Sequence, residues 1–171
     1  MTPEDALRAG LAVILPTDTV YGLCALPGNE AVLYELKGRD RSKPVALIAA
    51  DIASLLAAVP AIDRAMLERF LPGPFTLVVA TPDGGKIGVR VPNLPPAAAA
   101  VLAQTGPLAG TSANLTGGPE PRRVTDIPES IRTAVGAIVD AGELPGIPST
   151  VLDLTGAEPR VLREGAGKYD P

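Results

Sequence analysis

The sequence contains no histidine, no tryptophan and a single cysteine among its 171 residues. Without histidine, the chain cannot build a Ser-His-Asp or Cys-His arrangement or a histidine-ligated metal site, and it lacks the usual general base near neutral pH. The single cysteine, Cys24, allows no internal disulfide and is typical of a reducing compartment. We interpret Cys24 as a small packing residue. Any chemistry must therefore depend on positioning and fixed charge.

Aromatic residues, positive charge and long apolar runs are also scarce. Aromatic residues make up 3% of the chain and the formal net charge is −4, which argues against a broad nucleic-acid surface or a base-stacking platform. The longest unbroken apolar run, Ala97 to Ala103, is far shorter than the ~18 residues of a membrane span. The N-terminal segment MTPEDALRAG is acidic and is not typical of a signal peptide. We expect a cytoplasmic globular protein, with one domain over residues 1–171 and no strong nucleic-acid binding of its own.

Apolar segments alternate with segments that carry helix-capping signals. We predict helices over residues 2–10, 29–38 and 95–106, from Asp51, from Pro60 to near Phe70, and near 126–135. We predict strands over residues 11–15, 45–49, 75–80, 86–91, 137–142, 149–156 and 159–165, with a short strand that runs into a loop over 107–114. This alternation predicts an α/β fold with a mixed, twisted sheet.

The segment LPTDTVYGL places three hydroxyls, Thr17, Thr19 and Tyr21, and the carboxylate of Asp18 directly after the apolar run LAVIL. A strand that ends in a loop with ordinary turn hydroxyls accounts for this pattern when it is taken alone. Because no second carboxylate lies close in sequence, we interpret Asp18 as a cap rather than a general base.

The segment KGRDRSKP gathers Lys37, Arg39, Arg41 and Lys43 in an otherwise acidic chain. Lys and Arg bind phosphate through charge-assisted hydrogen bonds, so a phosphate-binding loop is one interpretation. The other is a solvated helix end, where cations interact favourably with the helix dipole. The cluster exceeds what a cap requires, and both interpretations remain open.

Two later segments are also candidates for a site. Thr111 to Gly118, TSANLTGG, is either a plain turn or a cradle of backbone and hydroxyl groups for an anion or a sugar. Arg90 lies between apolar neighbours in a predicted strand, so its charge needs a partner. A structural salt bridge and a substrate carboxylate account for Arg90 equally well.

Seven short segments follow one another in a fixed order. They are PTDTVYGL, KGR with the later KP, LPGPFTLVV, GVRVP, TSAN, PSTVLD and LREG. Each alone is unspecific, but their order from Leu15 to Gly165 resembles the YrdC-like threonylcarbamoyl-AMP synthase family, in its short single-domain form. The resemblance implies an open twisted α/β sheet with a large concave substrate-binding face. It also implies a nucleotidyltransferase that forms threonylcarbamoyl-AMP and pyrophosphate from L-threonine, bicarbonate and ATP, and hands the product to tRNA threonylcarbamoyl-transferase proteins.

The resemblance further implies the site residues. The ATP-binding residues are Lys37, Arg39, Lys43, Ser112, Asn114 and Arg163, with Lys37 and Arg39 as the catalytic cations on the triphosphate. The residues around the threonine are Thr17, Arg90, Gly110 and Ser149. Mg²⁺ is expected to enter with ATP, and no protein side chains are identified as its ligands.

The chain departs from the family pattern at several positions. Lys43 stands where many relatives carry Asn or Asp, and Ile48 where longer relatives often carry histidine. Gly110–Thr111 replaces a common Ala-Pro pair, and Glu120 replaces a frequent serine. Two alternative functions are a relative that adenylates another carbamoyl compound and an RNA-binding or ribosome-assembly module. The net acidity and the shortage of aromatic residues count against the second.

Overall fold

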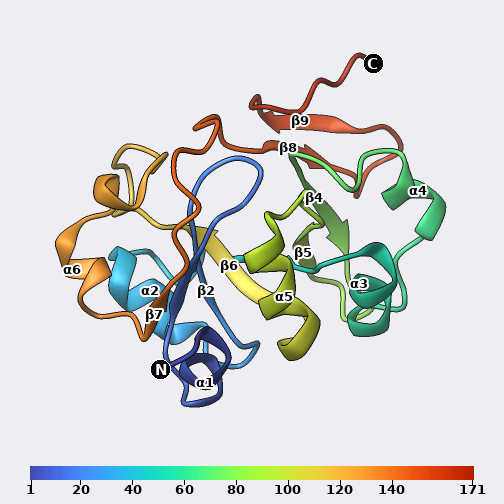
Figure 1. Cartoon of the computed structure of the whole chain (residues 1–171). Coiled ribbons are helices and arrows are strands. Elements are labelled where there is room, and N and C mark those ends of the chain that lie inside the picture. The colour runs from blue at the N-terminus through green and yellow to red at the C-terminus, as the bar shows by residue number, and fades with distance from the viewer.

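Nine strands form one mixed sheet in the computed structural model, which describes residues 1–171 (Figure 1). The strands are β1 (Val13–Leu15), β2 (Gly22–Ala25), β3 (Ala46–Ile48), β4 (Phe75–Ala80), β5 (Lys86–Arg90), β6 (Leu108–Ser112), β7 (Ala137–Ile138), β8 (Thr150–Asp153) and β9 (Arg160–Arg163). Their order is β7-β1-β2-β6-β3-β5-β4-β8-β9, with parallel pairing at β1–β7, β3–β5 and β4–β8 and antiparallel pairing elsewhere. The sheet has two free edges, which confirms the expected α/β fold with an open mixed sheet.

The helices are short, and two of the predicted caps are confirmed. The helices are α1 (Pro3–Arg8), α2 (Ala31–Lys37), α3 (Ile52–Ala58), α4 (Arg64–Glu68), α5 (Pro96–Thr105) and α6 (Glu129–Arg132), with a 3₁₀ helix η1 at Val124–Asp126. Thr2 accepts a hydrogen bond from a backbone N–H of α1, and Asp51 does the same for α3. None of the helices combines the length and the apolar character needed to cross a membrane.

Other predicted helix boundaries are wrong by a few residues. Asn29 does not cap α2, which begins at Ala31 after Glu30, a residue that makes no side-chain cap. The helix predicted from Pro60 begins only at Arg64, because the carboxylate of Asp63 caps it there. The predicted helix over 126–135 divides into η1 and α6 on either side of Pro128, whose ring removes a backbone donor.

Two strand predictions are corrected by long-range pairing. No strand was predicted over Gly22–Ala25, but this segment forms β2, which pairs with both β1 and β6. The strand predicted over 137–142 contains only Ala137 and Ile138. Beyond them the chain turns, and the hydroxyl of Tyr21 donates to the backbone carbonyl of Gly142 at 2.7 Å. Tyr21 therefore belongs to the scaffold.

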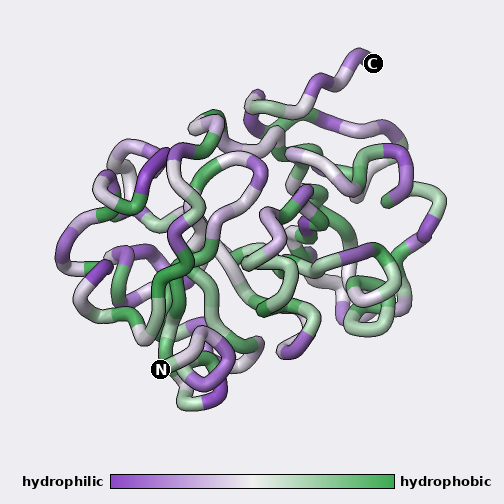
Figure 2. The backbone as a smooth tube through the Cα atoms, in the orientation of Figure 1, coloured by the Kyte–Doolittle hydropathy of each residue, from purple (hydrophilic) through white to green (hydrophobic).

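Side chains of the central strands alternate between two packed layers. Ile14 packs with α2, α6 and η1 on one face, whereas Val13 and Leu15 pack with α1 and α5 on the other. A third cluster joins β4 and β5 to α3 and α4. Figure 2 shows the apolar residues gathered in the central strands. Each fully buried Leu or Ile contributes roughly 1.5–3 kcal/mol, so this core holds the strands in a fixed register.

Candidate active site

A cavity of about 450 Å³ lies against the central strands. Four positions on its floor, Gly22, Ala46, Gly88 and Gly110, have little or no side chain. Ala46 and Gly110 are register partners across β3 and β6, so the small residues lie side by side. The sheet is therefore hollow at this point, and a ligand can approach its backbone. The volume is typical of a small-molecule site.

The cavity is strongly cationic although the chain is acidic. Five cationic side chains line it: Lys37, Arg39, Lys86, Arg90 and Arg163. Only one lining residue is acidic, Glu120. Such a concentration of positive charge in a partly enclosed space attracts anions and stabilises them once they are bound.

Lys37 lies at the end of α2, and its side chain is turned into the protein. The residue is 3% exposed, and its Nζ donates to the carbonyl oxygen of Ser112 at 2.7 Å and to Oδ1 of Asn114 at 2.7 Å. A longer contact of 3.4 Å reaches Oγ of Ser112. The pKa of Lys37 is lowered to about 8, chiefly by burial and also by the charge of Arg39, while Glu120 opposes the shift. The interpretation of Lys37 as a solvated helix-end cation is therefore wrong.

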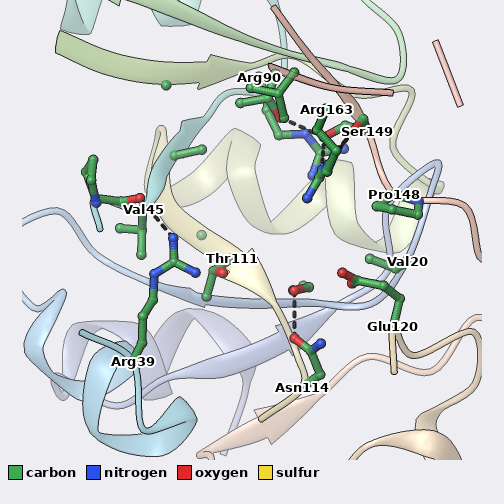
Figure 3. Close-up of a pocket in the computed structure, with 18 of the residues that line it drawn as sticks. Val20, Arg39, Val45, Arg90, Thr111, Asn114, Glu120, Pro148, Ser149 and Arg163 are labelled. Atoms are coloured by element: carbon green, nitrogen blue, oxygen red, sulfur yellow. Dashed lines mark hydrogen bonds between the residues drawn. The ribbon is translucent and has the colours of Figure 1, made fainter. Parts of the chain in front are cut away.

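The loop that follows β6 is fixed to the end of α2. Thr116 N donates to the carbonyl of Lys37 at 3.1 Å, and Nδ2 of Asn114 donates to the carbonyl of Gly118 at 2.8 Å. Oγ of Ser112 donates to Oδ1 of Asn114 at 2.7 Å (Figure 3). The segment TSANLTGG is thus a rigid wall of the cavity, built from small residues and their backbone groups.

The four cations of the predicted basic loop separate into two pairs. Arg39 lines the cavity, and its guanidinium donates to the carbonyls of Lys43 at 3.1 Å and Pro44 at 3.3 Å. Arg41 and Lys43 are exposed and do not line the cavity. Arg41 instead forms an exposed ion pair with Glu35, at 3.8 Å. Lys43 contributes its backbone to the position of Arg39 rather than its side chain to the site.

Two further arginines line the cavity away from Lys37. Nη2 of Arg90 lies 3.4 Å from Oδ1 of Asp18 and 3.3 Å from Oγ1 of Thr19. Burial lowers the pKa of Arg90, while Asp18 opposes that shift. Arg163 donates from Nη2 to the carbonyl of Ser149 at 2.7 Å and to its Oγ at 3.1 Å (Figure 3). Ser149 in turn shares a 2.7 Å hydroxyl contact with Thr76.

The salt bridge of Arg90 is present, yet its guanidinium also faces the cavity. Nε of Arg90 is buried and has no hydrogen-bond partner within the protein. Asp18 accepts from the backbone N–H of Asn93 at 3.0 Å, a contact distant in sequence rather than the local cap that the sequence suggested. A buried donor without a partner is rare, so this edge of Arg90 is suited to an incoming anion.

Eight of the ten residues proposed from the resemblance line the cavity. They are Lys37, Arg39, Arg90, Gly110, Ser112, Asn114, Ser149 and Arg163. Thr17 does not, because its hydroxyl is buried in the turn after β1, where it donates to the carbonyl of Val20 at 2.7 Å. Thr19 occupies the cavity wall in its place.

Sequence reasoning also missed Lys86, Thr76 and the role of Ile48. Lys86 and Thr76 lie on β5 and β4, and only the strand register shows that their positions face the cavity. A methyl group added at Gly110 would collide with Cδ1 of Ile48, so the two departures from the family pattern are complementary. Cys24 is buried in the core cluster with Val13 and Leu15, which confirms it as a packing residue, and burial raises its pKa to about 12.

Comparison with known proteins finds a family model and relatives that match most of this chain. Residues 5–165 match the Sua5/YciO/YrdC family model, whose description is "Telomere recombination". A putative threonylcarbamoyl-AMP synthase of Mycobacterium tuberculosis (strain H37Rv) is 36% identical over 178 residues, which covers 94% of this chain and 81% of the relative.

Solved structures give the same result. P. abyssi Sua5 complexed with L-threonine superposes with a TM-score of 0.84 at 31% identity over 95% of this chain. This chain covers about half, 52%, of that protein. E. coli YciO superposes with a TM-score of 0.82 at 25% identity. The superposed region covers 96% of this chain and 88% of the YciO chain. The chain belongs to the Sua5/YciO/YrdC family.

Proposed function

We propose that this protein is a threonylcarbamoyl-AMP synthase. The observation that carries the proposal is one cavity in which two groups of cations face the same space, Lys37 with Arg39 and Arg90 with Arg163. A reaction between two anionic substrates requires this kind of site. The M. tuberculosis relative is named for the same activity, and P. abyssi Sua5 was solved with L-threonine.

The proposed reaction needs no protein nucleophile, which fits a chain without histidine. The amine of L-threonine combines with carbon dioxide from bicarbonate to give a carbamate and release a proton. A carbamate oxygen then attacks the α-phosphorus of ATP, and the bond to pyrophosphate breaks. The protein contributes by holding the carbamate and ATP together and by stabilising the charge that develops on pyrophosphate.

The triphosphate is assigned to the wall that contains Lys37, Arg39, Ser112 and Asn114. The 3.4 Å contact from Lys37 to Oγ of Ser112 is the weakest of its three, so a phosphate oxygen would replace that contact first. Arg39 lies at the rim and presents its guanidinium to the same space. Mg²⁺ would neutralise part of the phosphate charge when it enters with ATP.

Threonine is assigned to the wall formed by Arg90, Thr19, Gly110 and Ser149. The unpartnered Nε of Arg90 is a ready donor for a carboxylate. Arg163 donates to the carbonyl and the hydroxyl of Ser149, and its charge lowers the pKa of Arg90. Two guanidinium groups close enough to interact in this way favour the binding of an anion between them.

The finer parts of the proposal concern the co-substrate and the fate of the product. Bicarbonate supplies the carbamate carbon, and separate proteins transfer the threonylcarbamoyl group to tRNA. Because its product is consumed on tRNA, the reaction belongs to the cytoplasm. A chain with five cations gathered in one partly enclosed cavity, rather than spread over an open surface, fits a small-molecule enzyme better than an RNA-binding module.

The test is an omission experiment with the purified chain. ATP, Mg²⁺, L-threonine and bicarbonate together should release pyrophosphate and form threonylcarbamoyl-AMP, identified by mass spectrometry. Omission of threonine or of bicarbonate should abolish both signals, and carbamoyl phosphate should not replace them. Pyrophosphate release that is indifferent to these omissions would contradict the proposal, and release that depends on carbamoyl phosphate would favour the carbamoyl-adenylating alternative.

A further inference from the structure

Glu120 is the one acidic residue that lines the cavity, and it is not satisfied within the protein. Its Oε2 is buried and accepts no hydrogen bond. Figure 3 shows the carboxylate pointing into the space between Asn114 and Val20. An ionised oxygen that is both desolvated and unpaired is costly, so a partner is expected from outside the chain.

The neighbouring donors are already engaged elsewhere. Lys37 is close enough for Glu120 to raise its pKa, yet its Nζ contacts are with Ser112 and Asn114. An ammonium group has three N–H donors, and these contacts use them. Oγ of Ser112 donates to Asn114. Glu120 therefore adds negative charge to this wall without taking part in its hydrogen-bond network.

The same wall is where the proposed function places the triphosphate, so a bare carboxylate there would repel ATP. A divalent cation removes the conflict, because Mg²⁺ in nucleotide sites is commonly held by one or two carboxylates together with substrate phosphates and water. No three His, Cys, Asp or Glu side chains converge anywhere in this chain. A single carboxylate that needs the substrate to complete the site would not be found by a search for such clusters.

We propose that Glu120 is a ligand, directly or through one water, of the divalent cation that accompanies ATP. The proposal rests on the proposed function, since it takes ATP as the bound anion. A neutral side chain at this position would neither repel the triphosphate nor attract the cation to this wall. The carboxylate therefore makes nucleotide binding by this chain depend more strongly on the metal.

The test is binding of a non-hydrolysable ATP analogue, measured by calorimetry with Mg²⁺ and with EDTA, for wild type and E120Q. With Mg²⁺, E120Q should bind the analogue on the order of tenfold more weakly, because a charge-assisted ligand is lost. With EDTA, E120Q should bind several-fold more tightly, because a like charge is gone. E120S should behave as E120Q does. E120D keeps a carboxylate, so its binding with Mg²⁺ and with EDTA should resemble that of wild type. Mn²⁺ titrated into the analogue complex and followed by electron paramagnetic resonance gives a direct metal readout.

The opposite effects expected for E120Q, weaker binding with Mg²⁺ and tighter binding with EDTA, separate the proposal from other roles of Glu120. Weaker binding of E120Q under both conditions would mean that Glu120 accepts a hydrogen bond from the nucleotide itself, such as from the ribose, and would overturn the metal role. Equal binding of wild type and E120Q would overturn it too. A wild-type chain that binds the analogue under neither condition would overturn the proposed function as well. Thermal melts of each variant show whether a loss of binding reflects a loss of folding.

Discussion

The two halves of the basic segment share a composition but occupy different environments. Lys37 is buried against Ser112 and Asn114, while Arg41 is exposed and forms only a loose ion pair at the surface. Gly38 ends α2 in the left-handed conformation and turns the chain away from the helix axis, and Arg39 directly after it still lines the cavity, so the division lies between Arg39 and Arg41. Cations that are equivalent in sequence therefore become a preorganised wall of the site on one side and a solvated loop on the other.

Burial distinguishes the cations that can stabilise a bound anion from those that cannot. A cation fixed by internal hydrogen bonds does not have to reorganise when an anion binds, and it acts in a medium that screens it less than water does. An exposed cation loses most of its effect to solvent and salt. The comparison therefore predicts a steep gradient of mutational effects along this one segment.

The largest effect is expected for Lys37→Ala. Loss of the ammonium removes a triphosphate contact on the order of 2–4 kcal/mol, or roughly 30- to 1000-fold in kcat/KM for ATP. It also removes the hydrogen bonds of Lys37 to the carbonyl of Ser112 and to Oδ1 of Asn114, which keeps only its bond from Oγ of Ser112, so we expect destabilisation of about 1–3 kcal/mol. A solvated helix-end cation, one of the two interpretations from the sequence, could be removed with little loss of stability, and the buried network corrects that expectation. Steady-state kinetics and a thermal melt measure the two losses separately.

Arg39→Ala tests the half-buried member of the segment. Its guanidinium donates only to backbone carbonyls of the loop, so ATP kinetics should fall by roughly 10- to 100-fold while the melting temperature changes little. Arg39→Lys should be intermediate at best, because an ammonium cannot reproduce the bidentate fork. Normal ATP kinetics in both Arg39→Ala and Lys37→Ala would show that ATP does not bind at this wall.

Gly110→Ala tests whether the floor of the cavity is as fixed as its wall. The added methyl group would collide with Ile48, so overpacking should destabilise the protein by about 1–3 kcal/mol. Ile48→Val shortens the opposing side chain and should recover most of that loss in the double variant. Urea unfolding of the two single variants and the double variant measures the coupling. Additive effects would mean that the two positions do not compensate for each other.

The pH dependence of nucleotide binding reports on Lys37 directly. The protonated ammonium is the form that attracts phosphate, and its pKa in the free protein is about 8. Affinity should therefore be nearly complete below about pH 7 and be lost as pH rises through about 8, by roughly tenfold between pH 7 and pH 9. Calorimetry with a non-hydrolysable ATP analogue avoids the pH dependence of bicarbonate. Lys37→Met is the matched control, and its weaker binding should show no such transition.

The sequence predicted the scaffold well where the signals were local. The apolar strands and the caps at Thr2 and Asp51 depend on neighbouring residues, and they are confirmed. The strand Gly22–Ala25 was missed because only its two partners make it a strand. The length of the predicted helix from Pro60 was overestimated because a capping signal at Asp63 competes with it.

The sequence predicted which residues belong to the site better than it predicted the contacts that each of them makes. The order of the motifs led us to propose Lys37, Arg90 and Ser149 as residues of one site, and the structure places all three around one cavity. Nothing in the spacing of the threonines shows that Thr17 supports the turn while Thr19 lines the wall, because that depends on how the turn packs. The unpaired oxygen of Glu120 likewise follows from where its neighbours' hydrogen bonds go, which sequence does not contain.

The smallest effect is expected for Arg41→Ala, and it is the sharpest test of the comparison. Arg41 lies two residues beyond Arg39, but it points to solvent and its contact with Glu35 is long and exposed. Such pairs contribute ~0–1 kcal/mol, so ATP kinetics should stay within about twofold of wild type and the melt should be unchanged. Lys43→Ala should behave in the same way, because the contact it makes with Arg39 uses its backbone carbonyl. A loss as large as that of Arg39→Ala in either variant, measured at 0.15 M and again at 0.5 M salt, would mean that the exposed loop closes onto the nucleotide. The distinction between a preformed wall and a solvated loop would then fail, because both halves of the segment would belong to the site.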